Sequence, residues 1–526
     1  MGSSLDLSAL DGSTGFRLDA VSTWDRLGRA VSEAGDVNGD GIDDLLIGAW
    51  GGSTGYAGES FVVFGKASGW AASLDLSTLD GTTGFRLDGV AAADYSGKAV
   101  GAAGDVNGDG FDDILIGAYK AASAAGHSYV VFGQASGWAA SLDLSDLDGS
   151  TGFRLDGIDA SDASGLSLSG AGDVNDDGFD DVIIGATNAA GNAGESYVVF
   201  GQASGWAASL DLSDLDGTTG FRIDGIDGSD RSGRSVSGAG DVNGDGIADL
   251  IVGAWGASPS GSASGESYVV FGKTSAWAAS LDLSTLDGST GFRLDGIDAA
   301  DDAGRSVSAA GDVNGDGFDD LMVGAWGGDP DGNAAAGESY VVFGGDFTHS
   351  VTHLGSSAAD TLTGTSGANV MVGGLGGDSL NGAGGADVLR GGAGDDNLTI
   401  ADLSFQRLDG GSGSDTLTLG GSGQSLDLTT TSNLKITSIE TIDISGSGAN
   451  TLTLELGDVL DISESVISGK TRLLVDGGAD DTVTATDSWT SGGTTTVSGN
   501  DYNVYTSGNA QLLIDTDIGT QTIPVP

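Results

Sequence analysis

Short apolar segments bounded by glycines run through the first 345 residues and predict β-strands. LLIGA at 45–49 and FVVFG at 61–65 are examples, and such lengths of four to seven residues are typical of strands. No segment stands out with an apolar residue at every third or fourth position, the spacing of an amphipathic helix. The pattern predicts an all-β fold.

These strands recur in a repeated unit. An aspartate opens the same polar loop at residues 36, 105, 173, 241 and 312, a period of 68 to 71 residues that is long enough for a four-stranded propeller blade. LDLS and VVFG elements each occur five times, whereas the linking WAAS segment occurs four times, at Trp70, Trp138, Trp206 and Trp277. Pairing the unmatched first LDLS with the unmatched last VVFG predicts a five-bladed propeller closed by the N-terminal strand, which protects its sheet edges. A seven-bladed ring completed by other sequence is the alternative.

The loop that opens each unit has the chemistry of a calcium site. In DVNGDGIDD, residues 36–44, oxygen donors alternate along the chain, and Gly41 stands where the backbone must fold back around an ion. Position nine is always Asp, whereas position eight includes Ala248, so position nine is the predicted ligand. Position twelve is always Ile or Val, which excludes an EF-hand. A solvated turn would explain one copy, but five sets of crowded carboxylates need a compensating cation.

The predicted ligands of the five loops occupy positions one, three, five, seven and nine, with the main-chain carbonyl serving at position seven. They are Asp36, Asn38, Asp40, Ile42 and Asp44; Asp105, Asn107, Asp109, Phe111 and Asp113; Asp173, Asn175, Asp177, Phe179 and Asp181; Asp241, Asn243, Asp245, Ile247 and Asp249; and Asp312, Asn314, Asp316, Phe318 and Asp320.

A second repeat of nine residues begins near residue 355. Blocks such as GGLGGDSLN and GAGGADVLR follow the template GGxGxDxUx, in which the glycines turn around an ion and the large apolar residue U enters a thin core. A flexible Gly-rich linker would explain the glycines but not an apolar residue at every ninth position. The predicted core residues are Leu362, Met371, Leu380, Leu389 and Leu398, and the predicted calcium ligands are Asp360, Asp378, Asp387, Asp396 and Asp415.

Both repeats resemble known families. The DxNxDGxxD loop before an apolar GA strand resembles the FG-GAP repeats of integrin α propellers, and the nonapeptides resemble the parallel β-roll of RTX proteins. The first resemblance implies calcium in a hairpin loop of each blade, although that family usually has seven blades. It also implies that a glycan or protein ligand meets the opposite face, at loops 51–58, 119–126, 187–194, 255–265 and 327–337.

We expect three regions: a propeller at 1–346, a β-roll at 347–419 and a β-rich C-terminal region at 420–526. The Thr-, Ile- and Leu-rich strands of the last region resemble the C-terminal regions of RTX adhesins, which are exported by type I secretion with an uncleaved C-terminal signal. That resemblance fits the absence of a basic and apolar N-terminal signal peptide. We therefore expect an extracellular or cell-surface protein.

The net charge of the chain limits the classes of partner that the protein can bind. The formal net charge is −57, from 76 acidic and 19 basic residues, which argues against nucleic acid and anionic membrane surfaces and favours divalent cations. No run of 18 apolar residues predicts a membrane span, and the absence of Cys excludes disulfides. Stability must then come from packing and Ca²⁺.

No catalytic motif is apparent. The three histidines belong to no HExxH motif and stand beside no GxSxG elbow, and acidic pairs are too frequent to single out one couple. We therefore expect a protein that is not an enzyme. The leading hypothesis is a calcium-dependent adhesion or binding module for a glycan or protein. The alternative is a structural protein that assembles with itself into an extracellular layer or filament, which the near-identity of the blades favours.

Overall fold

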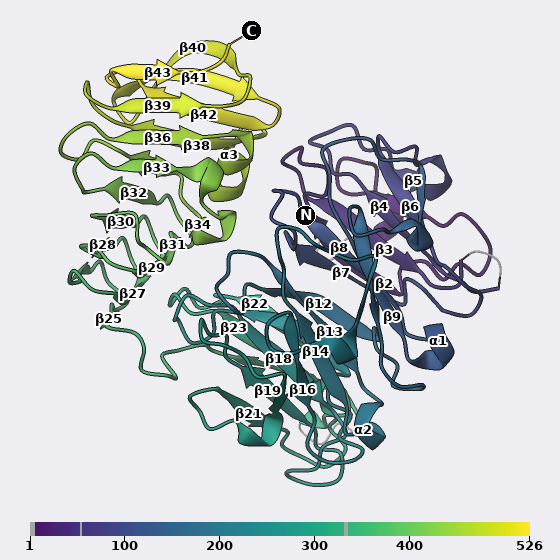
Figure 1. Cartoon of the computed structure of the whole chain (residues 1–526). Coiled ribbons are helices and arrows are strands. Elements are labelled where there is room, and N and C mark those ends of the chain that lie inside the picture. Colours follow the sequence, from purple (N-terminus) through teal and green to yellow (C-terminus); the bar gives the residue numbers. More distant parts are fainter. Residues whose placement is uncertain (1–5, 53–54, 331–334, 526) are drawn as a thin grey trace.

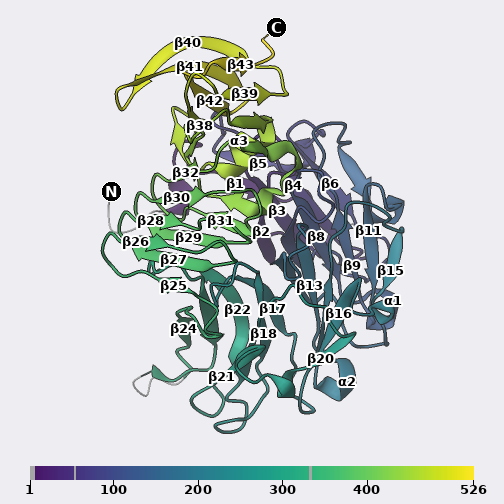
Figure 2. The same ribbon diagram turned by 60° about the vertical axis from the view of Figure 1, so that its left-hand side comes forward.

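The computed structural model describes residues 6–52, 55–330 and 335–525, and it consists of two β-rich bodies that lie side by side (Figures 1 and 2). The predicted all-β class is confirmed. The described α-helices are α1 (Ala121–Ala124), α2 (Ala189–Asn192) and α3 (Leu456–Ile462). The longest of them has seven residues, so no helix in the described ranges is long enough to cross a bilayer.

The first body is an array of five blades, as predicted. In each of the first four blades, three consecutive strands pair antiparallel and a fourth comes from the GFR segment after the next WAAS link. The blades are β2 (Ala30–Gly35), β3 (Asp44–Ala49), β4 (Glu59–Val63) and β6 (Gly84–Asp88); β7 (Ala99–Gly104), β8 (Asp113–Ala118), β9 (His127–Val131) and β11 (Gly152–Asp156); β12 (Ser167–Gly172), β13 (Asp181–Ala186), β14 (Glu195–Val199) and β16 (Gly220–Asp224); β17 (Ser235–Gly240), β18 (Asp249–Ala254), β19 (Glu266–Val270) and β21 (Gly291–Asp295); and β22 (Ala303–Gly311), β23 (Asp320–Ala325) and β24 (Glu338–Val342).

The LDLS elements form short outer strands followed by 3-10 turns. Each turn begins at an Asp whose side chain accepts a backbone N–H, as Asp75 does from Ser77. The outer strands add in parallel to a fourth strand: β5 (Ser73–Asp75) to β1 (Arg17–Asp19), β10 (Ser141–Asp143) to β6, β15 (Ser209–Asp211) to β11 and β20 (Ser280–Asp282) to β16. The turns are η1 (Leu7–Ala9), η2 (Leu76–Thr78), η3 (Leu144–Asp146), η4 (Leu212–Asp214) and η5 (Leu283–Thr285).

Aromatic and charged pairs repeat inside the blades. The linker Trp138 stacks on Phe85 with ring centroids 4.1 Å apart, so these tryptophans serve packing. The arginine of each GFR segment pairs with the aspartate two residues later, as Arg86 does with Asp88 at 2.7 Å. Both groups therefore belong to the structure of the repeat.

The predicted closure of the ring is wrong in this structure. Within the described strands β1 pairs with β5 and β24 pairs with β23, and no pair joins β1 to β24. The described part of β1 has three residues against five in β6 or β11, so it offers a shorter ladder, and β5 holds it beside the first blade. The fifth blade consequently leaves Met322, Val341 and Phe343 exposed.

The second body is a parallel β-roll, as predicted. Two nonapeptides make one coil, so Leu362 pairs with Leu380 and Leu380 with Leu398. One sheet contains β25 (His353–Leu354), β27 (Val370–Leu375), β29 (Val388–Ala393), β31 (Arg407–Asp409) and β34 (Ile436–Thr437). The other begins with β26 (Thr361–Thr363), β28 (Ser379–Asn381), β30 (Asn397–Ile400), β32 (Thr416–Leu419) and β35 (Thr441–Asp443).

The coil continues beyond residue 420 without a break. The second sheet extends through β38 (Lys470–Asp476), β42 (Ala510–Asp515), β41 (Asn500–Ser507) and β40 (Thr490–Val497), with β37 (Val466–Ile467) beside β38. A third contains β33 (Ser425–Asp427), β36 (Thr451–Leu454), β39 (Thr482–Ala485) and β43 (Thr520–Thr522), and η7 (Leu428–Thr430) and η8 (Asn433–Lys435) follow β33. One apolar core runs from Met371 to Ile518. The division at residue 420 stays a prediction.

Candidate calcium sites

The aspartate at position one organises each propeller loop, which joins the first strand of a blade to the second. Asp36 accepts the N–H of Asp40 on Oδ1 at 3.0 Å and the N–H of Gly41 on Oδ2 at 2.6 Å. Gly41 has φ +80°, a conformation that costs a glycine little. Equivalent bonds form at Asp105, Asp173, Asp241 and Asp312, so the predicted first ligands lie in one repeated geometry.

The aspartate at position nine is buried and ties the loop to the end of the third strand. Asp44 accepts the N–H of Val37 at 3.2 Å and the N–H of Gly65 at 2.8 Å. Nδ2 of Asn38 also donates to Oδ1 and Oδ2 of Asp44 at 3.2 Å, so an ion held by both side chains would replace these two bonds. The two backbone bonds form in the same way at Asp113, Asp181, Asp249 and Asp320.

These carboxylates lack the charge compensation that burial demands. Burial first, and then the charges of Asp36 and Asp40, raise the pKa of Asp44 to about 7. In the fourth loop, burial and the charge of Asp241 raise the pKa of Asp245 to about 7. A divalent cation among these groups would restore the ionised form at neutral pH.

The oxygen donors fit calcium. In the second loop, Oδ1 of Asn107 at position three is buried without a hydrogen-bond partner, an arrangement that a bound cation would explain. Within the described ranges no three Asp, Glu, His or Cys side chains converge into a metal site on their own. The predicted set has only three carboxylates per loop because its other two donors are an amide and a main-chain carbonyl.

Position eight has a role that the sequence comparison missed. The N–H of Asp36 donates to Oδ2 of Asp112 in the next blade at 2.7 Å, and Asp105 and Asp241 donate in the same way to Asp180 and Asp319 at 2.9 and 2.7 Å. The aspartate at position eight therefore joins neighbouring blades by a hydrogen bond, which we call the latch. Ala248 cannot form this bond, and its presence made the position look dispensable.

In the roll, the predicted ligands form a ladder with one aspartate per coil. The N–H of Asp360 donates to Oδ1 of Asp378 at 2.6 Å, Asp378 donates to Asp396 at 2.6 Å, and Asp396 donates to Asp415 at 2.7 Å. The N–H of Asp415 then donates to Oε2 of Glu440 at 2.8 Å. Glu440 was missed because it lies outside the nine-residue spacing.

The second carboxylate oxygen of three aspartates in this ladder has no hydrogen-bond partner. Oδ2 of Asp378, Asp396 and Asp415 is buried without a hydrogen-bond partner, beside the glycine turns at Gly373, Gly391 and Gly410. Burial raises the pKa of Asp415 to about 8, and the charges of Asp396 and Glu440 contribute. Orphaned carboxylate oxygens beside main-chain carbonyls fit Ca²⁺.

Asp387 stands apart from this ladder. It accepts the N–H of Asn369 on Oδ1 at 2.9 Å, so the structure places it in a second row with Asn369. The side chain of Asn369 also donates to the carbonyl of Thr365 at 3.2 Å and to that of Gly367. Here an amide occupies the position that aspartate holds in other coils.

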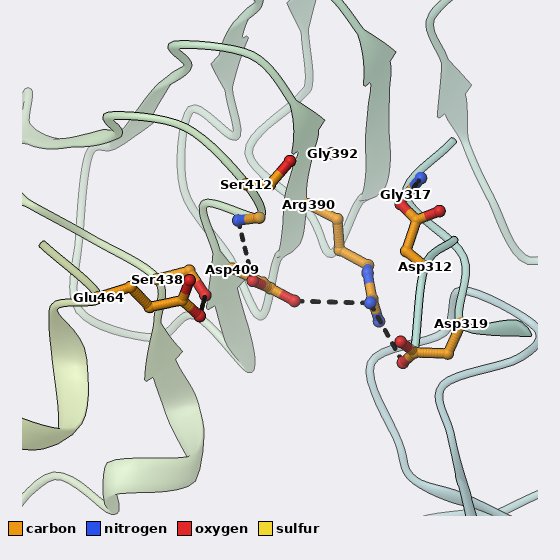
Figure 3. A pocket seen from close by; sticks show the side chains of 10 residues that line it. Asp312, Gly317, Asp319, Arg390, Gly392, Asp409, Ser412, Ser438 and Glu464 are labelled. Atoms are coloured by element: carbon orange, nitrogen blue, oxygen red, sulfur yellow. Dashed lines mark hydrogen bonds and ion pairs between the residues drawn. The ribbon is translucent and has the colours of Figure 1, made fainter. Parts of the chain in front are cut away.

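The calcium loops of the propeller face the roll. Arg390 of β29 is buried between the bodies, 2.7 Å from Asp241. It also lies 3.4 Å from Asp319 and 3.5 Å from Asp409 (Figure 3). Burial alone would lower the pKa of Arg390, but these three carboxylates raise it. A cavity of about 280 Å³ lies beside it.

Further contacts extend this interface across other blades. A Cβ placed on Gly41 would lie 2.6 Å from Leu460, and one on Gly246 would lie 2.7 Å from Val388. Oγ of Ser432 donates to the carbonyl of Gly178 at 3.0 Å. The roll therefore covers the loop face of the propeller.

Comparison with known proteins identifies both repeats. The FG-GAP repeat model matches residues 30–63, 90–131, 164–199, 232–270 and 303–342, and the RTX calcium-binding nonapeptide repeat model matches 354–389 and 363–398. These matches confirm the two predicted resemblances and support Ca²⁺ as the ion of the roll.

Curated relatives resemble the propeller region. Integrin alpha-4 of Xenopus laevis is 33% identical over 162 residues, 30% of this chain and 14% of the relative. Integrin alpha pat-2 of Caenorhabditis briggsae is 31% identical over 251 residues, 44% of this chain and 18% of the relative. Human integrin alpha-IIb is 32% identical over 156 residues, 29% of this chain and 14% of the relative. The chain thus spans less than a fifth of the length of these relatives.

Proposed function

We propose that this chain, in which five FG-GAP repeats precede RTX calcium-binding nonapeptide repeats, is an extracellular binding protein of the adhesion type whose fold depends on Ca²⁺. Its partner would be a glycan or a protein at a cell surface. The proposed role is not enzymatic. Turnover of a glycan or ester substrate that is abolished by one acidic substitution would contradict that part of the proposal.

The observation that carries the proposal is the different environment of the two propeller faces. Arg390 and the contacts at Gly41, Gly178 and Gly246 bury the calcium-loop face under the roll. The loops after β3, β8, β13, β18 and β23 lie at the opposite ends of the same strands and remain available to a partner. Residues 53–54 and 331–334 of these loops lie outside the described residues.

Calcium would act as a structural ion that couples folding to the environment. An ion that binds only the native state adds RT ln(1 + [L]/Kd), so five propeller sites at about ten times Kd would contribute roughly 7 kcal/mol. That is comparable with the stability of a whole domain. Millimolar calcium, as found outside cells, would saturate even sites with Kd of about 10⁻⁴ M.

The test combines folding and binding measurements. We expect chelation to lower the melting temperature and to loosen both bodies, and we expect the calcium-loaded protein to bind cell-surface material. Circular dichroism with and without chelator, calcium stoichiometry and a cell-surface binding assay measure these properties. An unchanged melting temperature after complete chelation would overturn the structural role of the ion.

Self-assembly is the second candidate, and the open propeller ends favour it. Among the described strands, β24 pairs on one edge alone, with β23, and β1 corresponds in sequence to the fourth strands that pair with β4, β9, β14 and β19 in the complete blades. β1 of one copy could therefore pair with β24 of another and extend into a fibre. Electron microscopy of the calcium-loaded protein distinguishes the two roles, because filaments or sheets would favour this second one.

A further inference from the structure

Basic residues gather at the propeller end that faces away from the roll. Five of the 19 Lys and Arg residues lie just before the first strand of a blade and a sixth, Arg305, lies near the start of β22, at the end of the strand away from its calcium loop. The first strands β2, β7, β12, β17 and β22 lie next to one another in this order. We call this group the cationic mouth: Arg26, Arg29, Lys98, Arg231, Arg234 and Arg305.

The cations of different blades come within electrostatic reach of one another. Arg29, Arg234 and Arg305, from the first, fourth and fifth blades, line one open cavity of about 710 Å³. Burial lowers the pKa of Arg234, and the charges of Arg305, Arg29 and Arg231 lower it further. Among the described residues, the one ion pair of this group joins Arg305 to Asp302 at 3.5 Å. Glu338 also lines the cavity.

Four of these cations contact tryptophan rings: Arg26, Lys98, Arg231 and Arg305. The ring centroid of Trp50 is 4.0 Å from Cζ of Arg26 and 4.8 Å from Nζ of Lys98. Trp255 contacts Arg231 at 5.3 Å and Arg305 at 5.1 Å, and Arg305 is also 4.9 Å from Trp326. A guanidinium stacked on a ring keeps its N–H groups free at the edge, where they can bind an oxyanion.

The mouth departs from the symmetry of the repeat. The third blade has Leu166 where the others have Arg29, Lys98, Arg234 and Arg305, and it has Thr187 where they have Trp50, Tyr119, Trp255 and Trp326. Blades that are nearly identical elsewhere thus differ here in both the cation and the aromatic ring. Such a difference is typical of a dedicated site, whereas a purely structural pair such as Arg86 and Asp88 recurs in every blade.

We propose that the cationic mouth binds an acidic polysaccharide, with its carboxylate or sulfate groups on Arg234 and Arg305 and a sugar ring on the exposed face of Trp326. Trp326 is 68% exposed, so its ring can pack against the apolar C–H face of a sugar while the adjacent guanidinium meets the anionic substituent. In a chain of net charge −57, six clustered cations concentrate attraction for anions at this one place. The inference deepens the proposed binding role by naming its ligand class.

The test measures binding of carboxymethyl dextran, dextran sulfate and unmodified dextran to the full-length, calcium-loaded protein by calorimetry. We expect both charged polymers to bind and the neutral polymer not to bind. Which charged polymer binds more tightly separates carboxylate from sulfate recognition. Equal binding of unmodified dextran would overturn the proposal.

Substitutions then locate the site. Arg234→Gln and Arg305→Gln should each weaken binding about tenfold or more, because each removes a charge-assisted hydrogen bond. Arg17→Gln is the matched control, since it removes the same charge from an exposed pair with Asp19 and should leave binding unchanged. Equal losses in all three variants would indicate a nonspecific charge effect and overturn the proposal.

The aromatic contribution separates sugar from peptide. Trp326→Ala should weaken binding of carboxymethyl dextran but not of inorganic sulfate. Because the side chain is exposed, the substitution should leave the calcium-dependent melting temperature unchanged, and this measurement checks that the variant is folded. Poly-glutamate that binds as tightly as carboxymethyl dextran, with no effect of Trp326→Ala, would identify an acidic peptide site instead. If the arginine variants still capture cell-surface material normally, this inference fails while the proposed binding role stands. If the wild-type protein captures none, the proposed role itself fails.

Discussion

Replacing Asp415 by asparagine should stabilise the calcium-free protein and destabilise the calcium-bound one. Asp415 is fully buried, and its Oδ2 has no hydrogen-bond donor. The amide keeps the oxygen that accepts the N–H of Asp396 and removes the uncompensated charge. Asn369 provides an internal precedent, because its amide donates to the carbonyl of Thr365 in the neighbouring turn.

The magnitude follows from the raised pKa. Burial first, and then the charges of Asp396 and Glu440, raise the pKa of Asp415 to about 8, whereas an unfolded aspartate has a pKa of about 3.9. The neutral form is therefore favoured by folding, and the stability it contributes is lost as pH rises from about 4 to about 8. Between pH 4 and pH 8 this lost stability amounts to about 5 kcal/mol, since the pKa is shifted by about 4 units and each unit is worth about 1.4 kcal/mol. We expect asparagine to recover about 2 to 5 kcal/mol at pH 8 and about 1 kcal/mol at pH 5.

Urea denaturation of calcium-free and calcium-saturated protein at pH 5 and pH 8 measures this effect. Asp480→Asn is the matched control, because it removes the same charge from an exposed position of the C-terminal region and should change stability little. With calcium at pH 8, Asp415→Asn should be less stable than the wild type and bind less calcium. A variant that is destabilised equally with and without calcium would refute the reasoning. It would show that a bound cation does not compensate the charge of Asp415.

Three further substitutions test the packing of the two bodies. Asp180→Ala should cost about 1 to 3 kcal/mol of propeller stability in urea denaturation, because the N–H of Asp105 loses its acceptor, whereas Asp43→Ala, at the open end, should cost little. Equal losses would exclude the latch. Arg390→Gln should cost about 3 to 5 kcal/mol by leaving Asp241 unpaired, and calorimetry should then separate the melting of propeller and roll; one unchanged transition would contradict a coupling role. Trp206→Ala should cost about 3 kcal/mol in thermal unfolding by removing its stack on Phe153, and a neutral result would argue against a packing role.

Much of the fold and of the calcium loops could be predicted from the sequence, because the contacts that form them are local. The wrapping of Asp36 around Gly41 is completed within six residues, so the loop pattern alone predicts it. Likewise, one apolar residue in every nine predicts the coil, because Leu380 and Leu389 must both enter a core that only one residue per block can reach. The five-blade count and the ladder of Asp378, Asp396 and Asp415 follow from these repeats.

Contacts between distant segments were decided only by the tertiary structure. The latch from Asp105 to Asp180 spans 75 residues, and the pair of Arg390 with Asp241 spans 149, so no local pattern marks them. Glu440 joins the aspartate ladder only because the coil brings it beside Asp415 after an irregular insertion. The sequence of a repeat determines the contacts within that repeat. The free energy of packing one repeat against another depends on how the two are placed in the fold. For that reason the open ring, the covered loop face and the gathering of cations at the mouth emerged only from the assembled fold.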